Sequence, residues 1–169
     1  MAEDSNTKVP HRRRREQKTD YQQRRKLLQS GKPRAVVRTS NQNTITHLAL
    51  FQREGDENTA QSVSKELEEY GWDYATGNIS AAYLTGFLTG IKAEEDEAIL
   101  DLGIKEKKNG GRIFAAVQGM NDAGLEVPVG EEAVPEEGRL KGEHIKEMRN
   151  EDIPSSVEEV KENIRGELE

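Results

Sequence analysis

Residues 34–51 contain two short runs in which polar and apolar side chains alternate. In the first run, one set of positions holds Arg34, Val36, Arg38 and Ser40, and the other holds Ala35, Val37 and Thr39. A period of two places successive side chains on opposite faces of a strand. Residues 44–51 form the second run, and Asn41, Gln42 and Asn43 between the runs indicate a hairpin turn. The pattern predicts a half-buried strand pair whose outer face carries two arginines.

Three later segments have the apolar spacing of helices. They cover residues 64–70 before Gly71, residues 79–91 after Asn78, and residues 111–124. Asn78 is a typical N-cap. Gly86 and Gly90 lie four residues apart in the second segment, which predicts close backbone packing rather than a hinge.

The remaining apolar stretches indicate the fold class. Residues 98–104 are nearly continuously apolar, which predicts a central strand buried on both faces. Residues 59–63 fit either a third strand or the first turn of a helix, and the period alone does not decide between them. Strand, loop and helix in this order predict an α/β layer fold.

The chain divides into three predicted parts. Residues 1–33 form a basic N-terminal arm, with a polar stretch over residues 1–20 that we expect to order only on a partner and a short helix over residues 21–29. Residues 34–130 form the core. Residues 131–169 form an acidic extension, in which Ser156 and Glu159 match a capping box. Its final helix carries an apolar stripe of Val157, Val160, Ile164 and Leu168 and is expected to pack on the body or on a neighbour.

Composition limits the possible functions. The chain has 169 residues, of which 33% are hydrophobic and 34% charged, enough for one modest core. We expect no membrane span, because no run approaches the roughly 18 apolar residues that a span needs, and no secretory leader. The chain has no cysteine, which excludes disulfides, thiolate zinc sites and cysteine nucleophiles and fits the cytosol. Its three histidines show no metal-binding spacing.

The net charge of −7 hides a strong asymmetry along the chain. Residues 1–40 hold twelve lysines and arginines against four acids, a net +8, so the other residues carry −15. Arginine pairs with phosphate through two parallel hydrogen bonds, so a basic arm on an acidic body indicates a polyanion partner. The alternative is a solvated tail without a partner. The acidic body is either a solvated surface or an adaptation to a salty cytoplasm, and the spread of acids through the whole body favours the adaptation.

Three further features invite a chemical role. Asp101 is a lone acid in an apolar strand, and catalysis would need convergent partners that the sequence does not supply. The basic, glycine-rich loop over residues 105–112 precedes a helix and suits either a phosphate contact or a mobile turn. His47 alternates with apolar residues and fits a sheet histidine better than a ligand, while residues 139–144 form a small basic island.

Several blocks, in order, resemble the archaeal ribosomal protein L-eighteen family. They are Lys8 to Glu16, Thr19 to Arg34, Val37 to Asn41, Tyr70 to Trp72, Gly77 and Asn78 with Ala82 to Gly86, Ala98 to Gly103, Asp122 to Leu125 and Gly142 to Ile145. The resemblance covers roughly residues 8–146. In addition, the predicted C-terminal helix is similar to the extended tails of halophile-type members.

The resemblance implies a ribonuclease-H-like core with a mixed sheet and packed helices. It also implies a protein of the cytoplasmic large ribosomal subunit that binds 5S rRNA in the central protuberance, beside the large-subunit rRNA and neighbouring proteins. Neither a cofactor, a metal, a membrane nor a small-molecule substrate is expected. The candidate RNA-binding residues are Lys8, Arg12, Arg13, Arg14, Arg15, Lys18, Tyr21, Arg24, Arg25, Lys32, Arg34, Arg38, Ser40, Asn41, Asn43, His47, Lys107, Arg112, Arg139 and His144.

Two other functions stay open at this point. A ribonuclease-H-like shape would also suit a metal-dependent nuclease, although the acid cluster such an enzyme needs is missing from the strands. A basic arm could instead bind acidic proteins as an adaptor.

Overall fold

A four-stranded mixed sheet lies at the centre of the computed structural model, which describes residues 9–149 and 151–168. Its strands are β1 (Arg34–Thr39), β2 (Thr44–Leu50), β3 (Glu57–Val63) and β4 (Ile99–Asp101). They lie in the order β3-β2-β1-β4, antiparallel except for β4, which runs parallel to β1. The segment whose type was left open, residues 59–63, belongs to strand β3.

The alternation in the first two runs produces two unlike sheet faces, as predicted. Ala35 and Val37 of β1 and Leu48 of β2 are fully buried on the face covered by helices. Val36 pairs with His47 on the other face. The turn between the strands is closed by Ser40, whose side chain accepts from the Asn43 amide at 2.9 Å. The predicted hairpin is confirmed.

Strand β4 departs from its prediction. We expected a central strand over residues 98–104, but the strand has three residues and lies at an edge of the sheet. Gly103 has φ 62° and donates its amide to Asp101 Oδ1 at 2.8 Å, which turns the chain away from the sheet. Ile104 beyond this turn is 48% exposed. The apolar run is explained by Ala98 and Leu100, which pack into the core from one face.

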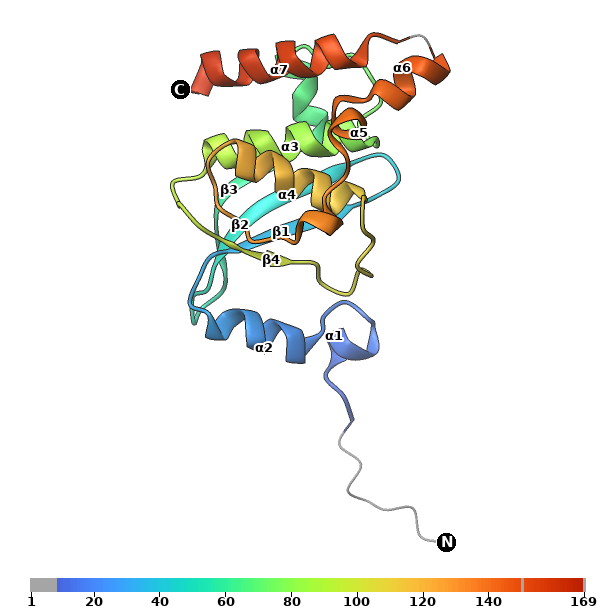
Figure 1. Cartoon of the computed structure of the whole chain (residues 1–169). Helices are drawn as coiled ribbons and strands as arrows, with labels where there is room; N and C mark the ends of the chain where they lie inside the picture. The colour runs from blue at the N-terminus through green and yellow to red at the C-terminus, as the bar shows by residue number, and fades with distance from the viewer. Residues whose placement is uncertain (1–8, 150, 169) are drawn as a thin grey trace, which may run out of the picture.

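Helices α3 (Ile79–Lys92) and α4 (Arg112–Asp122) cover one face of the sheet (Figure 1). Asn78 caps α3 as predicted, accepting from the Ala81 amide at 2.7 Å. The predicted close packing is confirmed, because a Cβ on Gly86 would overlap the Ala116 backbone of α4, and one on Gly90 would lie 2.6 Å from Ala123 Cβ. Residues Ser64–Tyr70, predicted as an ordinary helix, form the 3-10 helix η1, which ends at Gly71 with φ 95°.

The acidic extension contains η2 (Glu131–Ala133), α5 (Glu137–Lys141), α6 (Glu143–Arg149) and α7 (Ile153–Leu168). Helix α7 lies over α3, on the side away from the sheet (Figure 1). Val157, Val160 and Ile164 are buried in one cluster with η1 and α3. The predicted packing on the body is confirmed for these three residues and wrong for Leu168, which is 43% exposed at the helix end.

The predicted capping box in α7 is wrong, because the helix begins before Ser156. The Ser156 hydroxyl instead donates to the carbonyl of Asp152, the residue just before the helix, at 3.3 Å.

The basic arm contains two helices, α1 (Arg12–Arg15) and α2 (Tyr21–Gln29), on the side of the sheet opposite α3 and α4 (Figure 1). Helix α2 has the predicted bounds, and the Asp20 side chain caps it by accepting from the Gln22 and Gln23 amides. Arg12–Arg15, within the stretch that we expect to order only on a partner, form one helical turn. Lys8 lies outside the described residues. No helix in the described part of the chain has the length and apolar character needed to span a membrane.

Candidate nucleic-acid interface

The four consecutive arginines of α1 are all exposed. Arg12 lies 3.9 Å from Glu16, and Arg13 donates to the Thr19 hydroxyl at 2.9 Å. Arg14 and Arg15 make no side-chain hydrogen bond or ion pair with any residue that the structure describes. Lys18 also pairs with Glu16, at 3.0 Å. The turn therefore presents a dense cluster of guanidinium groups to solvent.

Helix α2 connects these arginines to the sheet. Its first residue, Tyr21, packs its ring against that of His11, with centroids 5.2 Å apart. Arg24 faces the body and donates both to Oδ1 of Asp56 at 2.9 Å and to Oδ2 at 2.8 Å. Arg25 on the next position is exposed. Lys32, just beyond the helix, pairs with Glu97 at 2.6 Å.

Arg34 does not belong to an exposed cationic face, contrary to the prediction. Its side chain is 4% exposed, and it donates to Asp101 at 2.7 Å and also to Asp56. A buried charge needs such partners, because an unpaired one is very costly. Arg38 is the more accessible of the two, with 39% of its side chain exposed, and it donates to the backbone and the carboxylate of Asp101.

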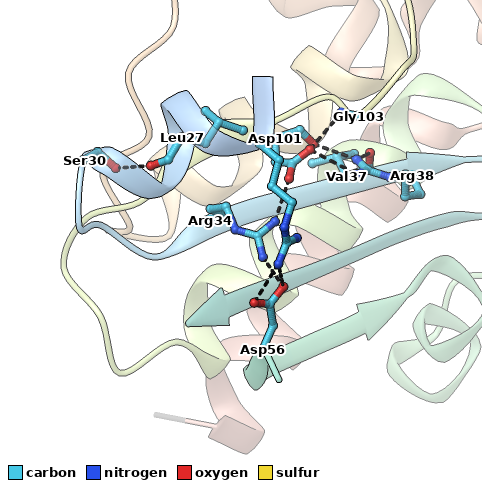
Figure 2. A network of polar contacts seen from close by, with 9 residues as sticks. Leu27, Ser30, Arg34, Val37, Arg38, Asp56, Asp101 and Gly103 are labelled. Carbon is cyan, nitrogen blue, oxygen red and sulfur yellow. Dashed lines mark hydrogen bonds and ion pairs between the residues drawn. The ribbon is translucent and has the colours of Figure 1, made fainter. Parts of the chain in front are cut away.

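Five charged side chains thus form what we call the arginine–carboxylate network: Arg24, Asp56, Arg34, Asp101 and Arg38. Figure 2 shows the Asp101 carboxylate between Arg34 and Arg38, with Asp56 on the far side of Arg34. No sequence pattern singles out Asp56, which lies in the polar loop after β2. Its role depends on a contact with a residue 32 positions earlier.

Asp101 is a satisfied structural acid in this network. Burial acts to raise the pKa of Asp101, but the hydrogen bonds and charge of Arg38, with further bonds from Arg34 and the Gly103 amide, hold it below its usual 3.8. Within residues 9–149 and 151–168, no group of three or more acids and histidines is placed to hold a metal. The geometry accordingly gives Asp101 a charge-pairing role.

His47 lies beside the network on the outer face of β2 and is partly buried. Burial, together with the positive charges of Arg38 and Arg34, lowers the pKa of His47 below 6.5. The imidazole is therefore mainly neutral at pH 7. The prediction of a sheet histidine agrees with this position.

The hairpin that carries Ser40, Asn41 and Asn43 is held by Arg112, at the start of α4, and by Thr76, which precedes α3. Arg112 donates to the Ser40 carbonyl at 2.7 Å and to the Gly77 carbonyl at 3.0 Å. Thr76 donates to the Gln42 carbonyl at 2.7 Å. In the structure, Arg112, predicted as a direct RNA contact, holds the hairpin backbone next to the residues that precede α3.

The structure brings the predicted basic loop and the basic island together. Arg112 lines one cavity of about 480 Å³ with Arg139 and His144 from much later in the chain, together with Lys105, Lys108 and the acidic Glu106. We call it the basic cavity. Lys107 lies in the same loop, exposed and outside the lining. The cavity has the charge and the open form that suit a phosphate-bearing partner.

Comparison with known proteins places the chain in a family. A family model described as ribosomal large subunit proteins 60S L5 and 50S L18 matches residues 5–97. A Korarchaeum cryptofilum protein named large ribosomal subunit protein uL18 is 49% identical over 148 residues, which is 86% of this chain and 76% of the relative. Proteins of the same name from Methanoregula boonei and Natronomonas pharaonis are 47% and 43% identical, over 95% of this chain and 95% and 96% of their own lengths. The chain therefore belongs to the family of ribosomal large subunit proteins that includes 60S L5 and 50S L18.

Proposed function

We propose that this protein binds 5S rRNA in the large ribosomal subunit and helps to attach it to the large-subunit rRNA and to neighbouring proteins of the central protuberance. The observation that carries the proposal is the exposed arginine turn Arg12–Arg15 on a body that is otherwise acidic. The family to which this protein belongs consists of structural ribosomal proteins rather than enzymes, and the protein is located in the cytoplasmic ribosome.

The mechanism is neutralisation of RNA phosphates by arginines whose positions are set by the fold. Each phosphate that is neutralised releases condensed counterions, so binding weakens as salt rises. The polar hairpin side chains Ser40, Asn41 and Asn43 suit contacts to 2′-hydroxyls and unstacked bases, which proteins use to recognise RNA. The basic cavity would receive a second stretch of RNA backbone, beyond the one held by the arm.

The strand order supports the ribonuclease-H-like core that the resemblance implies. Strands β1 to β3 form an antiparallel meander, and β4 adds beside β1 in parallel, with α3 between β3 and β4 in sequence. In this proposal the sheet and helices act as a scaffold, and the two basic regions at its surface carry the binding.

Filter binding to 5S rRNA over a range of salt tests the proposal. The double variant Arg14→Gln and Arg15→Gln should bind more weakly and flatten the slope of log K against log salt by about 1.5, since each lost phosphate contact contributes about 0.7–0.9. The matched control, Lys146→Gln with Arg165→Gln, removes two exposed cations from α6 and α7 and should leave the slope unchanged. Wild-type protein that binds 5S rRNA no better than an unrelated RNA would contradict the proposal, and so would equal slopes for the two variants.

A further inference from the structure

Asp56 connects two arginines that come from different parts of the chain. One of its partners is Arg24 of α2, which donates to both carboxylate oxygens, and the other is Arg34 of β1. Asp56 itself lies in the loop between β2 and β3. A single carboxylate thus joins the basic arm, the first strand and a loop of the sheet.

The rest of the network fixes this carboxylate in place. Arg34 also donates to Asp101 of β4, and Asp101 accepts from Arg38 at 3.0 Å (Figure 2). Three guanidinium groups share two carboxylates, so neither carboxylate is left unpaired. Because Arg34 is almost fully buried, its Asp56 partner cannot move away without leaving part of a buried charge uncompensated.

Helix α2 has few other attachments to the body. None of its residues is fully buried, and its half-buried apolar side chains are Leu27 and Leu28. A helix of nine residues is marginal in water without packing partners. Yet Val36 and Ala49, on the sheet face that α2 covers, are 5% and 2% exposed. The helix therefore lies close against the sheet although apolar burial alone holds it weakly.

We propose that Asp56 is a positioning residue that holds α2 against the sheet in the free protein, so that Arg12–Arg15 are presented at a defined place before RNA arrives. This inference rests on the proposed RNA-binding function. An arm held in advance loses less conformational entropy on binding than a free tail, which improves affinity without any new contact to RNA. Asp56 acts through Arg24, and it does not itself contact RNA.

Hydrogen exchange of the free full-length protein tests the docking without RNA. In Asp56→Asn, the amides of α2 should exchange at least about fivefold faster, the effect of losing a partly buried ion pair of about 1 kcal/mol. The first residues of β1 should also lose some protection, because the buried Arg34 loses one of its two carboxylate partners, so Arg24→Gln below isolates the arm contact. Glu54→Gln is the matched control, because Glu54 lies in the same loop, is exposed and has no ion pair within the described residues. Asp56→Glu keeps the charge and should restore protection. Equal exchange of α2 in Asp56→Asn and Glu54→Gln would overturn the proposal.

A second pair of variants protects the test against a folding defect. Arg24→Gln removes the same contact from the arm side, where nothing is fully buried, and should speed exchange in α2 to a similar extent. Its neighbour Arg25→Gln removes an exposed cation that makes no contact with Asp56 and should leave exchange unchanged. If α2 is as well protected in Arg24→Gln as in Arg25→Gln, the contact between Arg24 and Asp56 does not hold the arm.

Affinity for 5S rRNA distinguishes two possible roles of the Asp56 carboxylate. Its loss should weaken binding if it positions the arm and should strengthen binding if it competes with phosphate. Removing one negative charge favours RNA binding by simple electrostatics, as Glu54→Gln should show. If Asp56 positions the arm, Asp56→Asn should bind several-fold more weakly than Glu54→Gln despite the same change in charge. Tighter binding by Asp56→Asn would mean that the carboxylate competes with phosphate, which contradicts the proposal. Failure of the wild-type protein to bind this RNA would count against the function, whereas the exchange result would stand by itself.

Discussion

Asp101 keeps a negative charge in a nearly buried position because two arginines and a backbone amide face it. The side chain is 9% exposed, and each of its oxygens accepts from an arginine. Burial alone would favour the neutral acid, so the lowered pKa of Asp101 shows that pairing outweighs desolvation. The negative charge of Asp101 in turn compensates the buried positive charge of Arg34. The pair therefore acts as one unit, and removing either partner penalises the other.

We predict that Asp101→Asn lowers the free energy of unfolding by about 3 kcal/mol at pH 7, as expected when a buried pair loses one partner. A carboxyl whose pKa is lowered by folding stabilises the protein above its ordinary pKa of 3.8 and loses that contribution as the pH falls below it. Wild-type stability should therefore decline more steeply than that of the variant once the pH falls below about 4. Urea unfolding across this range measures it, with exposed Asp73→Asn as the control. Parallel declines would show that Asp101 is not preferentially charged in the fold.

Elements defined by a local pattern could be predicted from the sequence, and elements defined by distant partners could not. Helices α2 and α3 match their predictions closely, since caps and apolar spacing lie within each segment. Strand β4 was misplaced because apolar content does not reveal how many strands flank a segment, and its pairing with β1 joins residues 65 positions apart. Helices α5 and α6 are short and have no apolar period of their own, so no sequence pattern predicts them.

At the interface of α3 and α4, two helices touch backbone to backbone. A Cβ on Gly86 would overlap Ala116, so Gly86→Ala should force the helices apart and cost about 3 kcal/mol or more. Gly166→Ala is the control, because Gly166 lies in α7 with open space around its Cα and alanine favours helix there by about 0.5–1 kcal/mol. Thermal unfolding of both variants checks the pair. A stable Gly86→Ala would mean that the helices do not pack as closely as the structure has them.

On the scale of the molecule, the basic arm and the acidic α7 lie on opposite sides of the sheet-and-helix body (Figure 1). This charge separation orients the protein in the field of a polyanion, with the arginine turn leading. The sequence was enough to locate the arm, because a run of arginines is visible without a structure. It did not reveal that Arg34 is buried or that Arg112 clamps the hairpin, since both facts depend on partners far away in the chain.

The acidic extension shares a hydrophobic core with the rest of the body, so loss of a buried side chain from α7 should destabilise the whole molecule. Ile164 of α7 is fully buried in one cluster with Leu67, Trp72 and Phe87. Ile164→Ala should therefore cost about 2–4 kcal/mol, the range for an emptied core position. Leu168→Ala, at the exposed end of the same helix, is the matched control and should cost far less.

The way in which the Ile164→Ala protein unfolds is the more decisive result. If α7 is part of one cooperative core, circular dichroism of the helices and fluorescence of the buried Trp72 should report a single shared transition at lower urea. If residues 131–169 instead form a separate appendage, part of the helical signal should disappear first while the tryptophan signal keeps its wild-type midpoint. Because α7 seals the side of α3 that faces away from the sheet, we expect the shared transition: water admitted beneath α7 would reach Phe87 and Leu84, which belong to the same buried cluster.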